Sequence, residues 1–442
     1  MKAIVLTFDR LAPRILGCYG NAWIDTPHFD RLAVEGVVFD CCFGDWFGTR
    51  NAESASAECG VRNAESPGET GHAWFTGRYE CAHAGKEQRA ISALGEILKR
   101  AGIEMRLIVE EGANDPPWES ASFEDVRIVS GRDGLDVPDD ETPFAQLVAA
   151  GAACLDDWAK EGVENGLLWL KSRGVPRPWT PPREFAAEYV GLFEDEVDDA
   201  LEDESGERGG AIPPDLPATA GATTFDDVAA DPADESPDSE QADFDDEFND
   251  EDGGDDDERE AELAADLEEE AAEFDLLLDA LGRAGEGDPA RLTPGDWKLA
   301  RAVYAGYVSM LDAWLGELRE VVAESDEDVL WIITAAEGDA LGERVGLPVP
   351  SPPLAERVRV RGQSRDAPVV VAPTPPLAEE QVHLPLIVHF PGGEGGSRRQ
   401  DLVQTVDLAP TLSEFFGVDR DALDFDGHSL LPGIARNEPV PR

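Results

Sequence analysis

A strand-like run that ends in an acidic residue is the first place in this sequence where chemistry is expected. The apolar run Val329–Thr334 is typical of a buried parallel strand, and it breaks at Ala335, Ala336, Glu337 and Gly338. In open α/β sheets, ligands bind just beyond the carboxyl ends of the strands. The break offers two alanines and one carboxylate, so Glu337 is its one side chain able to bind a cation or move a proton.

Six cysteines are the other residues with potentially reactive side chains. Their spacing contains no CxxC pair and no Cys/His pattern of the kind that binds zinc. Buried or inert thiols are therefore favoured over disulfides. The six are Cys18, Cys41, Cys42, Cys59, Cys81 and Cys154.

The charge of the chain excludes two classes of partner. The formal net charge of the 442 residues is −58, so nucleic acid and anionic membrane surfaces would be repelled, and a basic protein or divalent cations fit better. The N-terminal apolar run is interrupted by Asp9 too early for a signal peptide, and no segment approaches a transmembrane length. These features predict a cytoplasmic protein.

The acidic residues are concentrated in one block. Between Gly191 and Glu270, 34 Asp and Glu residues stand against two Arg, which gives a net charge of −32 in that block. A self-repelling segment with few apolar residues cannot offset its own ordering entropy, so we expect a disordered loop. The pattern then changes to leucines at helical spacing from Leu263 to Leu281, which predicts a helix that follows the loop.

The rest of the chain alternates short apolar strands with helical patterns. Strands are predicted at Ala3–Thr7, Val329–Thr334 and Leu384–His389. This alternation is typical of an α/β layered sheet. The predicted organisation is one domain in two parts, 1–190 and 261–442, with a disordered acidic insertion at 191–260.

Six sequence blocks in order resemble the sulfatase family of the alkaline-phosphatase superfamily. The blocks are "LGCYGNAWIDTPHFDRLAVEGVVFD" (Leu16–Asp40), "FTGRYE" (Phe75–Glu80), "PRPWTPPREFAAEY" (Pro176–Tyr189), "YAGYVSMLDAWLGEL" (Tyr304–Leu318), the strand at Val329–Thr334, and segments of Leu384–Ile434. The resemblance spans nearly the whole chain outside the acidic block. It implies a large, mostly parallel sheet between helical layers, with a reduced or absent C-terminal subdomain.

The resemblance also implies where a nucleophile should lie. Sulfatases use a formylglycine made from the Cys of a C-x-P-S-R motif. By spacing from Thr76, the positions of the nucleophile, the Pro and the Arg of that motif are taken here by Pro67, Glu69 and Gly71. No catalytic residue is therefore expected. The neighbours Ser66, Thr70 and His72 are interpreted as surface or turn residues, and Cys59 lacks the flanking Pro and Arg of a displaced motif.

The metal site implied by the resemblance is reduced to fragments. In the family, calcium is held by Asp residues after the first strand and by an Asp-His or Asp-Asn pair after a later strand. Asp9 falls on one such position with Phe8 before it, while Ala336 and Glu337 replace the later pair. Asp9 and Glu337 are the vestigial metal candidates. Two alternatives stay open for them: a weakly bound, mostly hydrated calcium ion, or a solvent-exposed pair of carboxylates with no cofactor.

Cations that would face a sulfate are also missing from the expected places. Glu110 and Glu111 lie where relatives have positive charge, and the histidine of a later block is replaced by Pro176. Arg177 and Arg344 are able to bind an oxyanion, but on so acidic a chain internal ion pairing is favoured. The sequence thus predicts a catalytically inactive sulfatase-like protein that binds or scaffolds a partner; the alternative is a hydrolase of sulfate or phosphate esters with a relocated metal-dependent site.

Overall fold

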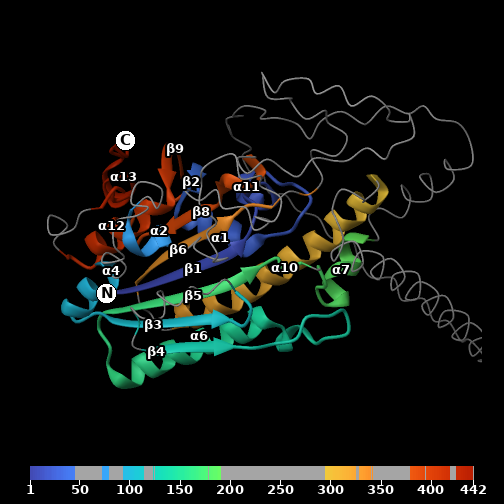
Figure 1. Cartoon of the computed structure of the whole chain (residues 1–442), viewed down its shortest axis with the longest axis horizontal. Helices are drawn as coiled ribbons and strands as arrows, with labels where there is room; N and C mark the ends of the chain where they lie inside the picture. Colours follow the sequence, from blue (N-terminus) through green and yellow to red (C-terminus); the bar gives the residue numbers. More distant parts are fainter. Residues whose placement is uncertain are drawn as a thin grey trace, which may run out of the picture. The chain divides into compact units, whose positions relative to one another are not determined.

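The computed structural model describes most of the chain outside the acidic block. The described residues are 1–44, 72–78, 93–113, 123, 125–177, 179–190, 294–324, 328–339, 341, 379–393, 395–418 and 425–441. They all belong to one compact unit, Met1–Asp195 with Leu278–Arg442 (Figure 1). The predicted insertion at 191–260 and the helix predicted after it lie outside the described residues.

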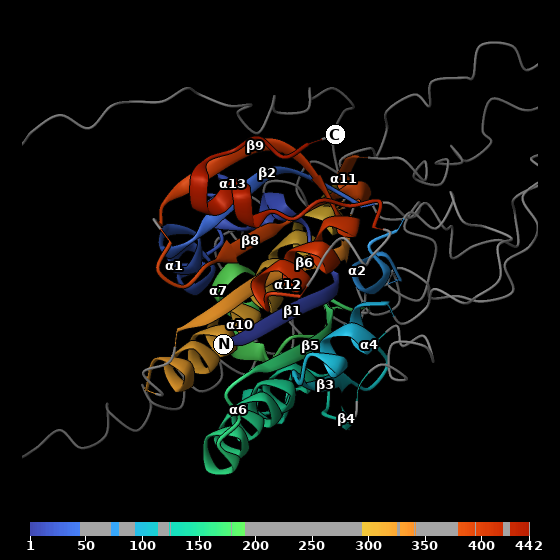
Figure 2. The ribbon, with the colours of Figure 1, turned by 90° about the vertical axis from the view of Figure 1, so that its left-hand side faces the viewer.

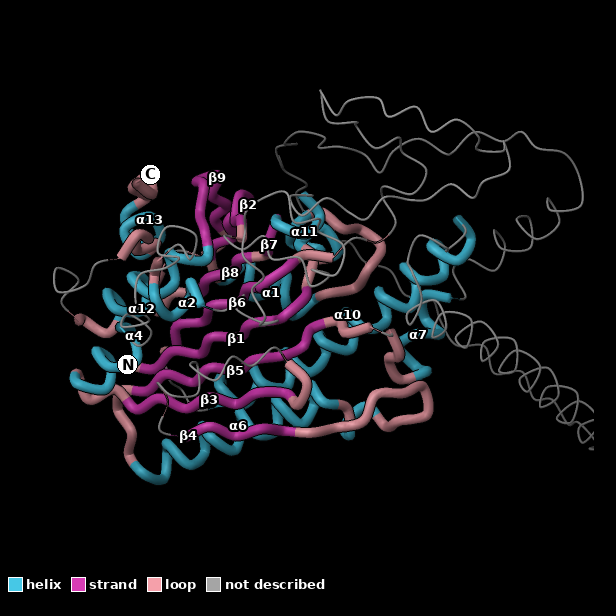
Figure 3. The backbone as a smooth tube through the Cα atoms, in the orientation of Figure 1, coloured by secondary structure: helices cyan, strands magenta, loops and turns pink. Residues whose placement is uncertain are grey.

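The described strands form one nine-stranded sheet. Its order is β4-β3-β5-β1-β6-β8-β2-β7, and β9 pairs with β2 (Figure 3). The strands are β1 (Lys2–Arg10), β2 (Val37–Phe43), β3 (Glu104–Glu110), β4 (Asp125–Val129), β5 (Gly166–Gly174), β6 (Val329–Glu337), β7 (His383–Leu384), β8 (Leu386–His389) and β9 (Ser397–Gln404). From β4 to β6 all neighbours are parallel, whereas β8 is antiparallel to β6 and to β2.

Helices cover both faces of the sheet (Figure 2). One face packs against α1 (Pro27–Glu35), α6 (Pro143–Glu161) and α10 (Pro294–Glu324), and we call it the α10 face. The other packs against α2 (His72–Thr76), α4 (Ala93–Arg100) and α12 (Leu408–Phe415), and we call it the α2 face. The remaining helices are α7 (Arg183–Val190), α11 (Glu379–Val382) and α13 (Leu431–Arg436).

The central strands are apolar on both sides because both faces are covered. In β1, Ile4, Leu6 and Phe8 join the core of the α10 face, while Ala3 and Val5 join that of the α2 face. Such a run on a two-sided parallel strand has no polar alternation. The prediction of an α/β fold with a large, mostly parallel sheet between helical layers is confirmed. None of the helices in the described part of the chain is long and apolar enough to cross a membrane.

Two local signals set element boundaries. The predicted strand Leu384–His389 is broken at Pro385, which cannot donate to a strand ladder, into β7 and β8. Helix α6 begins after Thr142, whose hydroxyl accepts from the Ala145 N–H at 3.4 Å, and it ends at Gly162 with φ 72°. A left-handed residue at that position favours glycine, which has no Cβ to clash.

Candidate functional site

The strand register separates the two vestigial metal candidates. Phe8 pairs with Ala335 and Arg10 with Glu337, so Asp9 lies beside Ala336. Because side chains alternate along a strand, Asp9 points to the α2 face and Glu337 to the α10 face. The register therefore does not bring these two carboxylates together. Glu337 instead has Arg10 as its neighbour, with Nε 3.9 Å from Oε2.

A row of polar side chains crosses the α2 face just below Asp9. Thr7 pairs with Lys171 of β5 on one side and with Thr334 of β6 on the other. All three are buried, and the Lys171 side chain is only 3% exposed. The Trp169 indole N–H donates to the Thr7 hydroxyl at 3.0 Å. We call Lys171, Thr7 and Thr334 the polar row.

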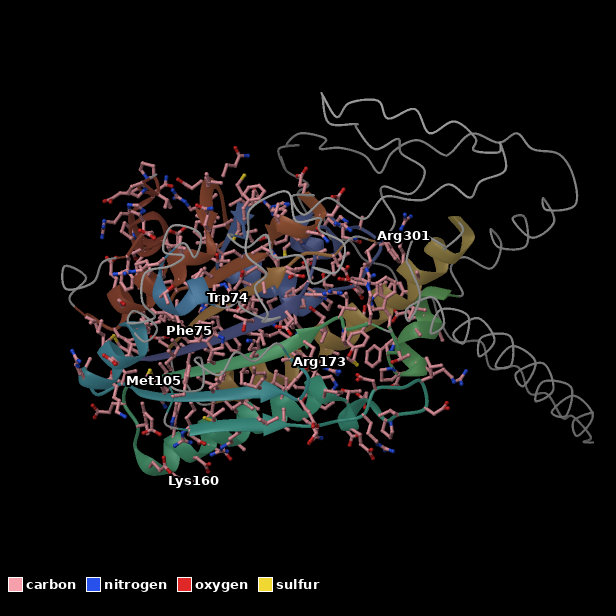
Figure 4. All side chains as sticks on the ribbon, viewed as in Figure 1. Trp74, Phe75, Met105, Lys160, Arg173 and Arg301 are labelled. Atoms are coloured by element: carbon pink, nitrogen blue, oxygen red, sulfur yellow. The ribbon has the colours of Figure 1, made fainter. Side chains whose placement is uncertain are left out.

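Aromatic side chains of α2 pack over this part of the sheet. The Phe75 ring stacks on Trp169 at a centroid distance of 4.2 Å, and Trp74 lies 6.2 Å from the same ring (Figure 4). Helix α2 carries the start of the "FTGRYE" block, and Thr76 is buried. This helix is thus fixed to β5 mainly by apolar contact.

The residues proposed around the former nucleophile are not described. Pro67, Glu69, Gly71, Ser66, Thr70 and Cys59 lie outside the described residues, and of His72 only the backbone is described. The structure gives no geometry for a nucleophile at these positions.

The described side chains on the Asp9 face do not form a calcium cage. Calcium prefers six to eight oxygen ligands. Asp9 is the one carboxylate that β1, β5 and β6 place on this face near the strand ends, the side chain of Ala336 beside it offers no ligand atom, and Lys171 brings a positive charge. Across the described part of the chain, no group of three or more His, Cys, Asp and Glu residues is arranged to hold a metal ion.

An ion network joins the carboxyl ends of β3 and β5. Glu110 Oε2 accepts from the Arg173 backbone N–H at 3.1 Å and from its Nε at 3.3 Å. The other end of the guanidinium donates to both carboxylate oxygens of Asp133, at 2.9 and 3.0 Å. The Tyr307 hydroxyl of α10 donates to Asp133 at 3.2 Å. Arg173 thus bridges two carboxylates.

Burial dominates the acidity of Glu110 in this network. Its side chain is 2% exposed, and this desolvation raises the pKa to about 7 although Ser172 and Arg173 stabilise the charged form. The neighbouring Glu111 is exposed. Where positive charge was expected from the resemblance, the structure thus places one buried and one exposed carboxylate.

The segment that follows β6 is held by three arginines from different parts of the fold. Arg177 donates to Asp339 Oδ1 at 2.9 Å, and Arg14 donates to the Asp339 carbonyl at 2.7 Å. Arg301 of α10 donates to the Leu341 carbonyl at 2.9 Å (Figure 4). The prediction that Arg177 pairs internally is confirmed, and Arg344 lies outside the described residues.

The described cysteines are free thiols. Burial raises the pKa of Cys154 to about 11 and that of Cys18 to about 12, so neither is a thiolate at neutral pH. The prediction of inert thiols is confirmed for these two, and Cys41 and Cys42 are likewise not in disulfides. Cys59 and Cys81 lie outside the described residues.

Sequence reasoning did not single out Lys171, Arg173, Asp133 or Tyr307. The stretch "GLLWLKSRG" carried one signal, since two basic residues follow directly on a run that is otherwise fully apolar. A cation at the end of a buried strand needs a nearby opposite charge. Asp133 and Tyr307 gave no such signal, because Arg173 and the other groups that they contact are distant from them in the sequence.

Comparison with known proteins places these observations in a family context. A family model described as Sulfatase matches residues 3–418. The multifunctional alkaline phosphatase superfamily protein PehA of Trinickia caryophylli is 25% identical over 186 residues, which cover 40% of this chain and 32% of that protein. The match thus spans about a third of this curated relative.

Solved structures share the fold at low sequence identity. The phosphonate monoester hydrolase of Agrobacterium radiobacter superimposes with a TM-score of 0.56 at 17% identity, covering 99% of this chain and 78% of that one. A protein solved in complex with its substrate D-glucosamine-2-N,6-O-disulfate gives a TM-score of 0.58 at 16% identity, covering 99% and 81%. At these identities the likeness concerns the fold alone.

Proposed function

Since the chain belongs to the sulfatase family, we propose that it is a catalytically inactive member that binds or scaffolds a partner rather than hydrolysing an ester. The supporting observation is that the described charges at the strand ends face one another. Arg10 lies beside Glu337, Arg173 bridges Glu110 and Asp133, and Arg177 pairs with Asp339.

Catalysis of ester hydrolysis needs a different arrangement. Positive groups must be aimed at the oxygens where charge develops, and loss of even one such donor typically costs about 10²–10³ in rate. An arginine that already bridges two carboxylates is largely neutralised by them, so it binds an additional anion only weakly. The paired arginines at this edge of the sheet are therefore better suited to stabilising the fold than to stabilising charge on a substrate.

A basic protein is the partner that fits the charge of the chain. A net charge of −58 attracts positively charged surfaces and speeds their encounter. Nucleic acid and anionic lipid are disfavoured by the same field. Neither weakly held calcium nor a cofactor is required for this role.

A turnover assay tests the proposal. The purified full chain is incubated with calcium and with p-nitrophenyl sulfate, p-nitrophenyl phosphate and p-nitrophenyl phenylphosphonate. We expect no release of nitrophenol above the blank. Turnover that disappears in the Asp9→Ala variant would refute the proposal, because it would show that a site around Asp9 works.

The alternative is a hydrolase with a relocated site around Asp9, with Glu337 and Ser66 or Thr70. This alternative is supported by the likeness of fold to a phosphonate monoester hydrolase, which covers 99% of this chain. The separation of Asp9 from Glu337 by the sheet argues against a metal shared by the two. The phosphonate substrate in the same assay distinguishes the hypotheses.

A further inference from the structure

The loop that follows β4 is lightly packed. None of the residues 130–138, all of which the structure describes, is buried. Its tip is bound to a neighbouring segment by backbone hydrogen bonds, in which the Gly134 N–H donates to the Thr180 carbonyl at 3.2 Å and the Arg183 N–H donates to the Leu135 carbonyl at 2.8 Å. Segments with little buried apolar surface open locally at a small cost in free energy. We call residues 130–138 the β4 loop.

Asp133 ties the β4 loop to the sheet and to α10. Its two carboxylate oxygens accept from the Arg173 guanidinium at 2.9 and 3.0 Å (Figure 4), and one of them also accepts from the Tyr307 hydroxyl at 3.2 Å. Burial raises the pKa of Tyr307 well above its ordinary value, so this hydroxyl stays a neutral donor at pH 6 to 8. The charge that holds Asp133 in this network is therefore that of Arg173.

Glu110 binds the opposite side of the same guanidinium. Its Oε2 accepts from Nε of Arg173 at 3.3 Å and from the Arg173 backbone N–H at 3.1 Å. The groups that face it are Ser172 and Arg173 of β5, Tyr307 of α10 and, across the guanidinium, Asp133. A charge gained by Glu110 therefore neutralises the arginine to which Asp133 is bound.

The two carboxylates differ in how easily they return to water. The Glu110 side chain is 2% exposed and lies on a core strand, whereas that of Asp133 is 33% exposed and lies on the β4 loop. Two carboxylates on one guanidinium also repel each other. A buried carboxylate loses more without its partner than a partly exposed one does. Glu110 should thus keep the guanidinium, and Asp133 should be the group that is released.

We propose that Arg173 is a pH-dependent latch for the β4 loop, which it holds through Asp133 while Glu110 is protonated and loosens when Glu110 is ionised. The loop follows the carboxyl end of β4, and ligands of α/β proteins bind at this edge of the sheet, so loosening it changes access to that edge. Coupling between two groups is reciprocal, so a closed loop also favours the protonated Glu110. The inference does not depend on whether the protein has activity.

Hydrogen exchange followed by mass spectrometry tests the latch on the full chain at pH 6 and pH 8. The wild type is compared at each pH with Glu110→Gln, which cannot ionise, so that the chemical exchange rate cancels. At pH 8, peptides containing Gly134 should exchange about fivefold or more faster in the wild type, the lower end of usual coupling between sites. At pH 6 the two proteins should agree within about twofold. Equal exchange at pH 8 would overturn the proposal.

Two further variants separate the latch from a general effect of mutation. Asp133→Asn removes the charge that Arg173 holds, so its β4 loop should exchange as fast at pH 6 as the wild-type loop does at pH 8, after correction for the chemical rate. Glu111→Gln changes the exposed neighbour of Glu110 and should follow the wild type at both pH values. A slowly exchanging loop in Asp133→Asn would overturn the proposal, because the loop would then be held by other groups.

The reciprocal effect provides a measurement that does not need Glu110→Gln to fold. Asp133→Asn leaves the Arg173 guanidinium to Glu110, which should ionise more readily. The pH midpoint at which the unfolding free energy falls should therefore move down by about 0.7 unit or more, which is the same fivefold coupling. Urea unfolding between pH 4.5 and 8 locates the midpoint for the wild type and for the variant. An unchanged midpoint would overturn the latch.

Discussion

Two regions of the molecule each bury a carboxylate, and these carboxylates have different partners. Asp312 lies where α1 meets α10, and Glu110 lies at the carboxyl end of the sheet. Asp312 of α10 accepts from the Phe29 N–H at 2.8 Å and from the His28 N–H at 3.1 Å, at the first turn of α1. Glu110 is held by Arg173. Burial raises the pKa of both to about 7.

The difference lies in what each carboxylate stabilises. Asp312 satisfies backbone donors that every helix start leaves without an intrahelical partner. Its role is thus imposed by the fold. Glu110 accepts from one backbone N–H and otherwise balances the Arg173 guanidinium, a side chain that is itself replaceable, so most of its role is imposed by the present neighbours. Parts of the scaffold that serve backbone groups should therefore tolerate change less than the ion networks at the strand ends.

The largest loss of stability is expected from substitution of Asp312. Asp312→Ala leaves buried backbone N–H groups of α1 without an acceptor and should lower the unfolding free energy by about 3 kcal/mol. Asp312→Asn keeps one acceptor oxygen and should cost about half as much. Urea unfolding of both variants measures this. A cost below about 0.5 kcal/mol for Asp312→Ala would contradict the helix-capping role.

The pH dependence of stability should distinguish Glu110 from its exposed neighbour. Between about pH 4.5 and 7 the folded carboxyl keeps a proton that the unfolded chain has released, so stability falls as pH rises through this window. Glu110 should account for a loss of about 3 kcal/mol in unfolding free energy by pH 8.

Glu110→Gln should remove this part of the slope, whereas Glu111→Gln, next to it and exposed, should not. Chemical unfolding at pH 5, 6, 7 and 8 gives the curves for both variants and the wild type. Asp312 is unchanged in all three, so its own titration cancels in the comparison. Parallel curves for wild type and Glu110→Gln would show that Glu110 does not hold a proton in this range.

A smaller loss of stability is expected from a substitution where α1 and α10 approach each other closely. A Cβ at Gly316 would lie 2.5 Å from Cε1 of His28, so Gly316→Ala should cost about 1–2 kcal/mol. Because the obstacle is a side chain, His28→Ala in the same chain should recover most of the loss. Thermal unfolding of the single and double variants tests this, and additive costs would argue against the clash.

The smallest effect is expected from the acidic block. Deleting Ser205 to Glu258 should shift the melting temperature by no more than a few degrees, because loop-closure cost changes slowly with length. A pull-down of basic proteins from cell extract should weaken only if the block captures partners. A large loss of stability would mean that the block is packed into the fold.

The fold was predictable because its signals are local. The strands at Ala3–Thr7 and Val329–Thr334 lie within β1 and β6, and the block Tyr304–Leu318 lies within α10. Apolar runs and helical spacing identify such elements without knowledge of their partners. The block around Leu16–Asp40 contains α1 and most of β2.

The arrangement of the site was not predictable to the same degree, because it depends on register. Glu337 and Asp9 each end a predicted strand, but one sequence does not say that Phe8 aligns with Ala335. A shift of one residue would reverse which face each carboxylate occupies. The pairing of Arg173 with Asp133 likewise depends on a loop and a strand that meet only in the folded chain.

The position of β1 in the sheet has a consequence for synthesis. Among the described strands this one is synthesised first, yet its neighbours are β5, which begins at Gly166, and β6, which begins at Val329. Its apolar residues therefore lack one strand partner until Val329 and the residues after it have been made. Long-range parallel pairing of this kind is slow and leaves aggregation-prone apolar segments exposed in the meantime. Yield in a cell should thus depend on chaperones that shield the newly made β1.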